Sequence, residues 1–172
     1  IGAGEAFICA GIESMSRVPM GGYNPLPNPE LAAARRGAYM GMGQTAENVA
    51  EKYQITRAEQ EKFAVASQKK AAEARAAGRL ADEIVPIHTK AGDVTEDGLI
   101  RPDTTEEVLA GLKPAFDKDG TVTAGTASPL TDGAAAVLVT SEEFAKKHGL
   151  TILARIKSVA ISGCEPETMG LG

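Results

Sequence analysis

Two short apolar runs, separated by roughly 120 residues of mostly polar and helical character, constrain the fold of this chain most strongly. Residues 6–10 form a continuous apolar run, which predicts a strand buried on both faces, with Cys9 as a buried and unreactive thiol. Residues 134–140 predict a second strand. This order predicts an α/β core from which a mostly helical subdomain departs and to which the chain then returns.

The strongest local signal inside the excursion is a capping box. Thr56 supplies a hydroxyl at the N-cap and Glu59 a carboxylate three residues later, which predicts a helix from Thr56 to about Ala77 that ends at Gly78. The other expected elements are helices at 30–36, 45–53, 105–112 and 141–148, an edge strand at 83–87 interrupted by Pro86, and a strand at 153–162.

Composition narrows the function classes. The 172 residues include 18 Lys and Arg and 23 Asp and Glu, so the net charge is −5, which argues against a nucleic-acid binder that neutralises phosphates. There is no apolar run near 18 residues, so no membrane span is expected. Cys9 and Cys164 lie too far apart for a zinc ribbon or a dense disulfide framework, and no metal ligands cluster.

The ends of the sequence resemble cut ends. The first residue is Ile1, and residues 169–172 are glycine-rich, as in a loop that leads onward. No secretory or organelle signal is recognisable. We therefore expect this chain to be part of a longer polypeptide whose active site includes residues outside it.

The most distinctive stretch is 121–133, where small and hydroxyl-bearing residues leave the backbone open to a ligand. Arg101 is the basic residue of most interest near it. His88 is expected on the surface and His148 at a helix C-terminus, so neither has the sequence context of a catalytic base. The residues alone predict a ligand-approaching loop without a complete catalytic site.

Three longer stretches carry a family resemblance. They are AGIESMS at 10–16, MGQTAENVA at 42–50 continued by FAVASQ at 63–68, and the segment 120–136. Together, in this order and spacing, they resemble the thiolase family of coenzyme A-dependent 3-ketoacyl-CoA acyltransferases. The similarity covers the whole chain.

The resemblance implies an α/β fold of two similar halves packed face to face, with a loop domain inserted in the first half. This chain would then supply part of the N-terminal core sheet, the mostly helical loop domain and the first strand of the C-terminal half. The implied division is 1–16 for a core strand, 17–128 for the loop domain, 129–150 for the return strand and helix, and 151–172 for the start of the C-terminal half.

The family's mechanism is a ping-pong cycle through a cysteine thioester, assisted by a histidine and a second cysteine. None of the motifs that carry these groups occurs here, and Cys9 and Cys164 match other positions. No catalytic residue is therefore transferred to this chain. The resemblance implies coenzyme A and acyl-CoA as substrates, with no permanently bound cofactor and no metal.

Five residues match positions that bind coenzyme A in the family. Ser128 would contact the pantetheine amide, Arg101 would lie beside the adenine and its phosphates, and Phe116, Ala124 and Met42 would line the pantetheine channel. Each has a plainer interpretation. Arg101 is also typical of a solvated loop, Phe116 and Met42 of an ordinary core, and Ser128 of a turn.

Within the family, three positions favour the degradative enzymes over the acetoacetyl-forming ones, namely Pro129, Val108 and Gly41. The resemblance implies a cytoplasmic homodimer or homotetramer that cleaves 3-ketoacyl-CoA in fatty acid β-oxidation. The alternatives are a biosynthetic acetyl-CoA acetyltransferase, a non-catalytic acyl-CoA-binding relative, and an α/β module without a ligand. This chain alone is expected to be inactive.

Overall fold

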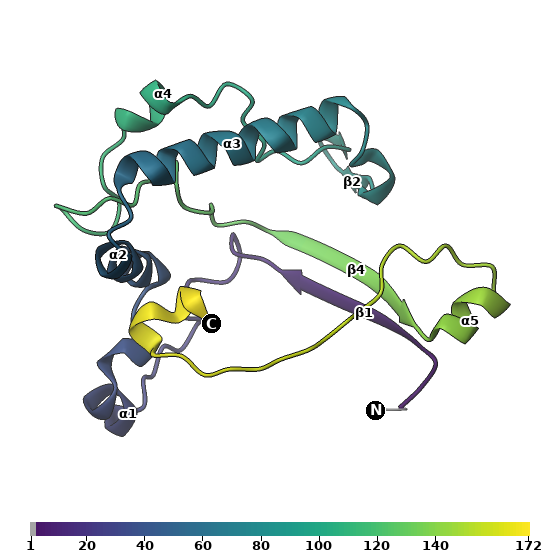
Figure 1. Ribbon diagram of the computed structural model, residues 1–172, viewed down its shortest axis with the longest axis horizontal. Helices are drawn as coiled ribbons and strands as arrows, with labels where there is room; N and C mark the ends of the chain where they lie inside the picture. The colour runs from purple at the N-terminus through teal and green to yellow at the C-terminus, as the bar shows by residue number, and fades with distance from the viewer. Residues whose placement is uncertain (1–2) are drawn as a thin grey trace. The chain divides into compact units, whose positions relative to one another are not determined.

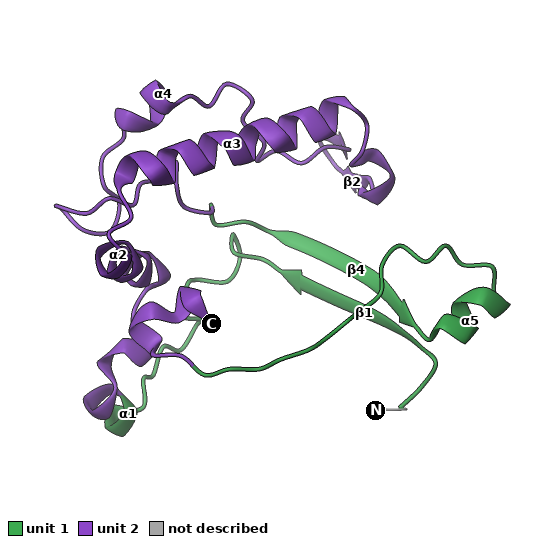
Figure 2. Cartoon of the chain, in the orientation of Figure 1, with its two compact units in different colours: residues 1–31, 129–163 green, residues 32–128, 164–172 purple. Residues whose placement is uncertain are grey.

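The computed structural model describes residues 3–172 of the chain (Figure 1). These residues form two compact units, one made of residues up to 31 with 129–163 and the other of 32–128 with 164–172 (Figure 2). The elements are β1 (Ala6–Glu13), α1 (Pro29–Ala34), η1 (Arg36–Tyr39), α2 (Met42–Tyr53), α3 (Arg57–Ala76), η2 (Ala81–Glu83), β2 (Ile87–Thr89), β3 (Gly92–Val94), α4 (Glu106–Ala110), β4 (Gly133–Thr140), α5 (Glu142–Lys147) and η3 (Pro166–Leu171).

The first unit contains the two strands predicted from the apolar runs. β1 and β4 pair antiparallel over their full length, from Ala6 opposite Thr140 to Glu13 opposite Gly133. The excursion therefore leaves and returns to the sheet, as the sequence predicts, and the structure shows that the two strands are neighbours. Beyond the strands, the backbone N–H of Ser16 donates to Asp132 Oδ1 at 2.8 Å and the Ser16 hydroxyl donates to Oδ2. These bonds join the residues that follow β1 to the residues that precede β4.

The expected burial of β1 on both faces is wrong. Ile8 is 80% exposed, Ile12 is 85% exposed, and Cys9 is exposed rather than buried. An apolar strand sequence indicates that both faces of the strand favour contact with other apolar side chains. Those side chains have to come from another layer of secondary structure. Among the described residues, the unit that contains β1 and β4 supplies no layer over this sheet.

The strand expected at 153–162 is also wrong. Residues 151–161 have no regular secondary structure, and Leu153 is 93% exposed. A strand requires a neighbour that accepts its backbone hydrogen bonds, and this segment has no partner strand among residues 3–172. One side chain ties it to α5, where Arg155 forms an ion pair with Glu142.

The second unit contains the helices, and their local signals are confirmed. α3 begins after a complete capping box, with Glu59 N–H donating to Thr56 Oγ1 and Thr56 N–H donating to Glu59 Oε2 at 2.8 Å. Gly78 follows its end with φ +72°, a conformation that favours glycine. α2 begins at Met42, three residues before the expected start.

The edge strand expected at 83–87 is wrong. The chain forms the single turn η2 there, and the strand starts only at Ile87, where β2 pairs with β3 in a short hairpin. Pro86 lacks the N–H that a strand would donate, so pairing begins after it. No helix among the described residues has the length and apolarity to cross a membrane.

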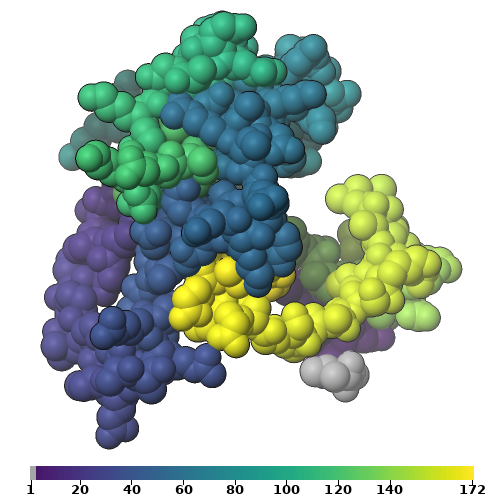
Figure 3. All heavy atoms as spheres, turned by 60° about the vertical axis from the view of Figure 1, so that its left-hand side comes forward, coloured from purple at the N-terminus to yellow at the C-terminus, as the bar shows by residue number. Residues whose placement is uncertain are grey.

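η3 packs against α2 within the second unit, where residues 164–172 lie against the helix in Figure 3. Asn48 on α2 donates from Nδ2 to the Glu167 carbonyl at 2.8 Å. Arg35 pairs with Glu165 at 2.9 Å, and a Cβ on Gly37 would overlap the Glu167 side chain. The last nine residues are therefore fixed to the helical unit by specific contacts.

Candidate functional site

The candidate site begins at a carboxylate on α2. Glu47 is 9% exposed and accepts hydrogen bonds from Thr121 N–H at 2.9 Å, Val122 N–H at 2.8 Å and the Thr121 hydroxyl at 3.1 Å. Gln60 on α3 donates to that same hydroxyl at 2.9 Å. The start of the small-residue stretch, 121–122, is thus fixed to two helices.

The next residues form a tight turn. Thr123 is fully buried and its N–H donates to Thr126 Oγ1 at 3.0 Å. A Cβ on Gly125 would overlap the methyl groups of Leu109 and Leu112, so the turn packs closely on the α4 region. Ala124 lies within this turn and is exposed. The turn therefore presents its backbone and one methyl group to the solvent.

Phe116 reaches α2 across the same segment. Ala115 N–H donates to the Val122 carbonyl at 2.9 Å, and Pro114 pairs with Thr123 in an isolated bridge, which positions the following Phe116. A Cβ on Gly43 would overlap the Phe116 ring, so the ring lies directly on the helix backbone beside Met42. Phe116 is 48% exposed and Met42 is 71% exposed, which leaves an apolar surface open.

A hollow of about 330 Å³ lies beside this surface. Its lining is mostly apolar, with a few polar groups, which is typical of a ligand pocket. The residues that line it are Met42, Thr45, Ala46, Val49, Ala50, Ile55, Gln60, Val122, Thr126, Met169 and Gly170. α2, the 122–126 turn and η3 therefore form a single apolar hollow.

The structure places the predicted site residues in two groups. Met42, Phe116 and Ala124 lie around the start of α2 and the turn. Arg101 lies before α4, where its N–H donates to Gln68 Oε1 on α3 at 2.8 Å, and its guanidinium forms no ion pair with the described residues. Ser128 is exposed and follows the turn without a hydrogen bond to the other four within residues 3–172. Within this chain, Phe116 and Met42 are both exposed.

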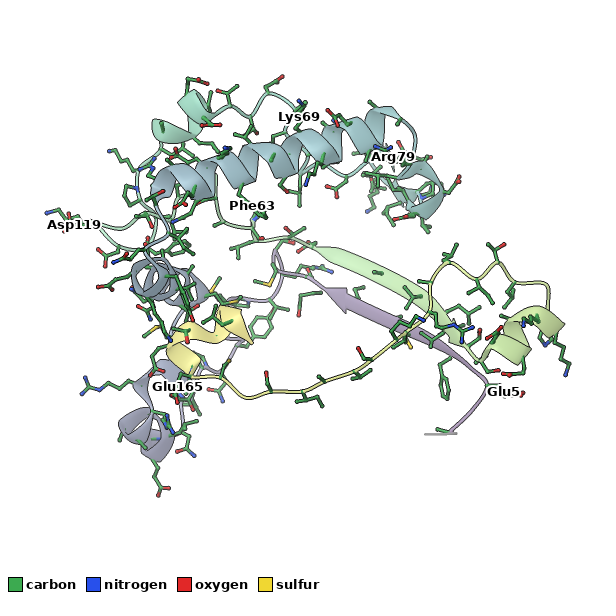
Figure 4. The ribbon with its side chains drawn as sticks, in the orientation of Figure 1. Glu5, Phe63, Lys69, Arg79, Asp119 and Glu165 are labelled. Carbon is green, nitrogen blue, oxygen red and sulfur yellow. The ribbon has the colours of Figure 1, made fainter. Side chains whose placement is uncertain are left out.

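A second hollow, of about 490 Å³, shares Ala50 and Ile55 with the first and has an acidic lining. Glu51, Asp117 and Asp119 line it, and Figure 4 shows Asp119 at the tip of its loop. In the part of the chain that the structure describes, no group of three or more His, Cys, Asp or Glu side chains is arranged to hold a metal ion. A polyanionic ligand is repelled by such a surface.

Sequence reasoning missed three residues that build the site, namely Gly43, Glu47 and Gln68. A glycine inside a helix is an available signal, because it costs about 1 kcal/mol relative to alanine and so implies a close approach. An acidic residue on a helix has no such signal, since most are solvated. Glu47 and Gln68 are identifiable only from their partners, 74 and 33 residues away in sequence.

The order and pairing of these elements define an α/β protein with a long helical insertion between two adjacent strands of one sheet. The family model described as thiolase, N-terminal domain, matches residues 1–143. The chain belongs to the thiolase family, as its motifs predict.

Individual curated proteins are similar in sequence to this chain over nearly all of its length. The 3-ketoacyl-CoA thiolase of Bacillus subtilis strain 168 is 44% identical over 185 residues, covering 100% of this chain and 47% of that protein. The acetyl-CoA acetyltransferase of Rhizobium meliloti strain 1021 is 47% identical over 188 residues, covering 99% of this chain and 47% of that protein. The chain thus spans about half the length of the curated relatives it matches.

Two solved structures share the fold. The dimeric peroxisomal thiolase of Saccharomyces cerevisiae superposes with a TM-score of 0.88 at 37% identity, over 98% of this chain and 44% of that one. Human mitochondrial 3-ketoacyl-CoA thiolase in complex with CoA gives a TM-score of 0.79 at 41% identity, over 98% and 46%. The thiolase-like α/β fold expected from the sequence is confirmed.

Proposed function

We propose that this chain supplies one wall of the coenzyme A channel of a thiolase. The observation that carries the proposal is the exposed apolar pair Met42 and Phe116 at the start of α2, where Met42 also lines the hollow, in a family with a relative whose solved structure contains CoA. This surface suits the methylene-rich pantetheine arm. Arg101, whose guanidinium is free to pair with phosphate, suits the nucleotide end, and the Ser128 hydroxyl suits a pantetheine amide.

The reaction proposed for the whole protein is acyl transfer. A 3-ketoacyl-CoA and coenzyme A would give acetyl-CoA and an acyl-CoA shortened by two carbons, through a cysteine thioester in a ping-pong cycle. The nucleophile and its base would lie outside these 172 residues. Metals and permanently bound cofactors have no role in this proposal.

The degradative role in fatty acid β-oxidation is the first form of the proposal, and Pro129, Val108 and Gly41 support it. The names of the relatives support the degradative and the biosynthetic role equally, because one relative is a 3-ketoacyl-CoA thiolase and another is an acetyl-CoA acetyltransferase. An assay of the whole protein distinguishes them, since a degradative enzyme cleaves long 3-ketoacyl chains and an acetoacetyl-forming enzyme does not.

We further propose that residues 17–128 are the inserted loop domain, with 1–16 and 129–150 in the N-terminal half. Residues 151–172 would begin the C-terminal half. The whole protein is proposed to be a cytoplasmic homodimer or homotetramer. The described dimer of the yeast relative supports the oligomer.

Calorimetric titration of the 172-residue chain with coenzyme A tests the proposed channel. We expect saturable binding that weakens about tenfold in Phe116→Ala, because the half-buried ring presents part of the apolar surface. Tyr53→Ala is the matched control, since Tyr53 is a similarly exposed ring at the far end of α2. Absence of CoA binding, or equal losses in both variants, would contradict the channel. Thiolysis by this chain alone would contradict the placement of the catalytic groups.

A further inference from the structure

We infer that each end of the proposed coenzyme A site is positioned by one polar side chain of the helical unit, Glu47 for the pantetheine surface and Gln68 for Arg101. The inference rests on the proposed function and deepens it. Neither side chain contacts the ligand in this scheme. Both are positioning residues that act through the backbone they hold.

The Glu47 carboxylate binds the start of the segment that begins at Thr121. Its oxygens accept from two consecutive backbone N–H groups, at 121 and 122, and from the Thr121 hydroxyl. A Cβ on Gly120 would overlap the same carboxylate, so the loop passes directly over it. Hydrogen bonds to an ionised acceptor are about twice as strong as neutral ones, which makes Glu47 the dominant link between α2 and this loop.

The position set by Glu47 is passed along the backbone to the ligand-facing groups. The Val122 carbonyl accepts from Ala115 N–H at 2.9 Å, which places Phe116 on Gly43. Thr123, the next residue, begins the turn that contains Ala124. Two of the three apolar site residues therefore depend on the register that Glu47 imposes.

Gln68 has the corresponding role for the nucleotide end. Its Oε1 accepts from Arg101 N–H at 2.8 Å, and the Arg101 carbonyl accepts from the Thr104 hydroxyl at 2.8 Å. These bonds fix the backbone of a long exposed cation in an otherwise irregular loop. Fixing the backbone reduces the freedom that the guanidinium loses when it pairs with a phosphate.

The two positioning systems are separable. Among residues 3–172, no hydrogen bond joins the 101–104 loop to the 114–126 segment. Glu47 lies on α2 and Gln68 on α3. A substitution at one is therefore expected to weaken one end of the ligand selectively, which a general loss of folding cannot do.

The test uses the full 172-residue chain, its Glu47→Gln and Gln68→Ala variants, and three probes, namely coenzyme A, pantetheine and adenosine 3′,5′-bisphosphate. Binding is followed by calorimetry and, for pantetheine, by NMR shift changes. Glu47→Gln is expected to weaken pantetheine and coenzyme A about fivefold to tenfold and to leave the bisphosphate within twofold. Gln68→Ala is expected to weaken the bisphosphate and coenzyme A and to leave pantetheine unchanged.

Glu73→Gln is the matched control, an exposed carboxylate on α3 that lines neither hollow, and it should change none of the three affinities. Equal losses for both probes in Glu47→Gln, or no loss, overturn the inference. If Glu47→Gln does not fold, Thr121→Val decides, because it removes only the hydroxyl that bridges Gln60 and Glu47. Lack of coenzyme A binding by the unsubstituted chain overturns the proposed function itself.

Discussion

At the scale of single residues, Gly43 shows how a locally unfavourable choice serves the site. Glycine inside a helix is about 1 kcal/mol less favourable than alanine, yet it stands in the first turns of α2. The reason is the ring of Phe116, which occupies the space of a Cβ. Helix propensity and ligand-surface geometry therefore oppose each other at this position.

Gly43→Ala is expected to displace the Phe116 ring while changing stability little. The gain in helix propensity, at most about 1 kcal/mol at this second position of the helix, offsets part of the loss from exposing a half-buried ring, which is about 1 kcal/mol. The melting temperature should thus move by only a few degrees, while the affinity for coenzyme A falls several-fold. Thermal melts and calorimetry check both quantities.

Gly98→Ala is the control, because a Cβ there meets open space and the backbone is not in the left-handed region. It should leave the affinity unchanged. A Gly43→Ala variant that binds coenzyme A as well as the unsubstituted chain would show that the Phe116 position is unimportant for binding.

At the scale of elements, helix ends explain why α3 is a secure base for the site. The capping box fixes its first turn, and Arg57 in that turn donates to the carbonyls of Leu109, Ala110 and Leu112 at the end of α4. Arg57 also pairs with Glu61 at 2.6 Å. The first turn of α3 therefore supplies hydrogen bonds to the backbone carbonyls at the C-terminal end of α4.

Thr56→Ala is expected to destabilise the helical unit by about 1 kcal/mol, because the Glu59 N–H loses its acceptor and the box opens. Urea unfolding followed by circular dichroism measures the change. Thr151→Ala, in an exposed segment without regular structure, is the control and should be neutral. An equal effect of both substitutions would mean that the box contributes nothing measurable.

The same contrast explains which elements are predictable from sequence. The start of α3 and the N-cap of α5 at Ser141 follow from side chains that bond to backbone only a few residues away. The segment 153–162 has a strand-like pattern, but its structure depends on a partner that the pattern does not contain. The candidate site divides likewise, since motif positions reveal Phe116 and Arg101 but not the distant residues that hold them.

At the scale of the molecule, surface carboxylates make the stability of both units depend on pH. The Lys146 and Arg155 side chains beside Glu142 lower the pKa of that carboxyl from 4.5 to about 2. Hydrogen bonds from the backbone and hydroxyl of Thr56 lower the pKa of Glu59, and those of Ser16 lower the pKa of Asp132. Each carboxylate thus favours the folded state when it is ionised.

These shifts all predict a loss of stability in acid. Because the folded-state pKa lies below the unfolded value, the contribution of each carboxylate to stability is complete above about pH 5 and disappears as the pH falls toward 2.

Glu142→Gln removes the pairs with Lys146 and Arg155, so we expect a lower melting temperature at pH 6 and a shallower fall between pH 5 and 2.5. Glu96→Gln, on an exposed loop, should reproduce the parent profile. Identical acid limbs in the parent and Glu142→Gln would refute the assignment. High salt should weaken the Glu142 effect, because the ion pairs are exposed and screened.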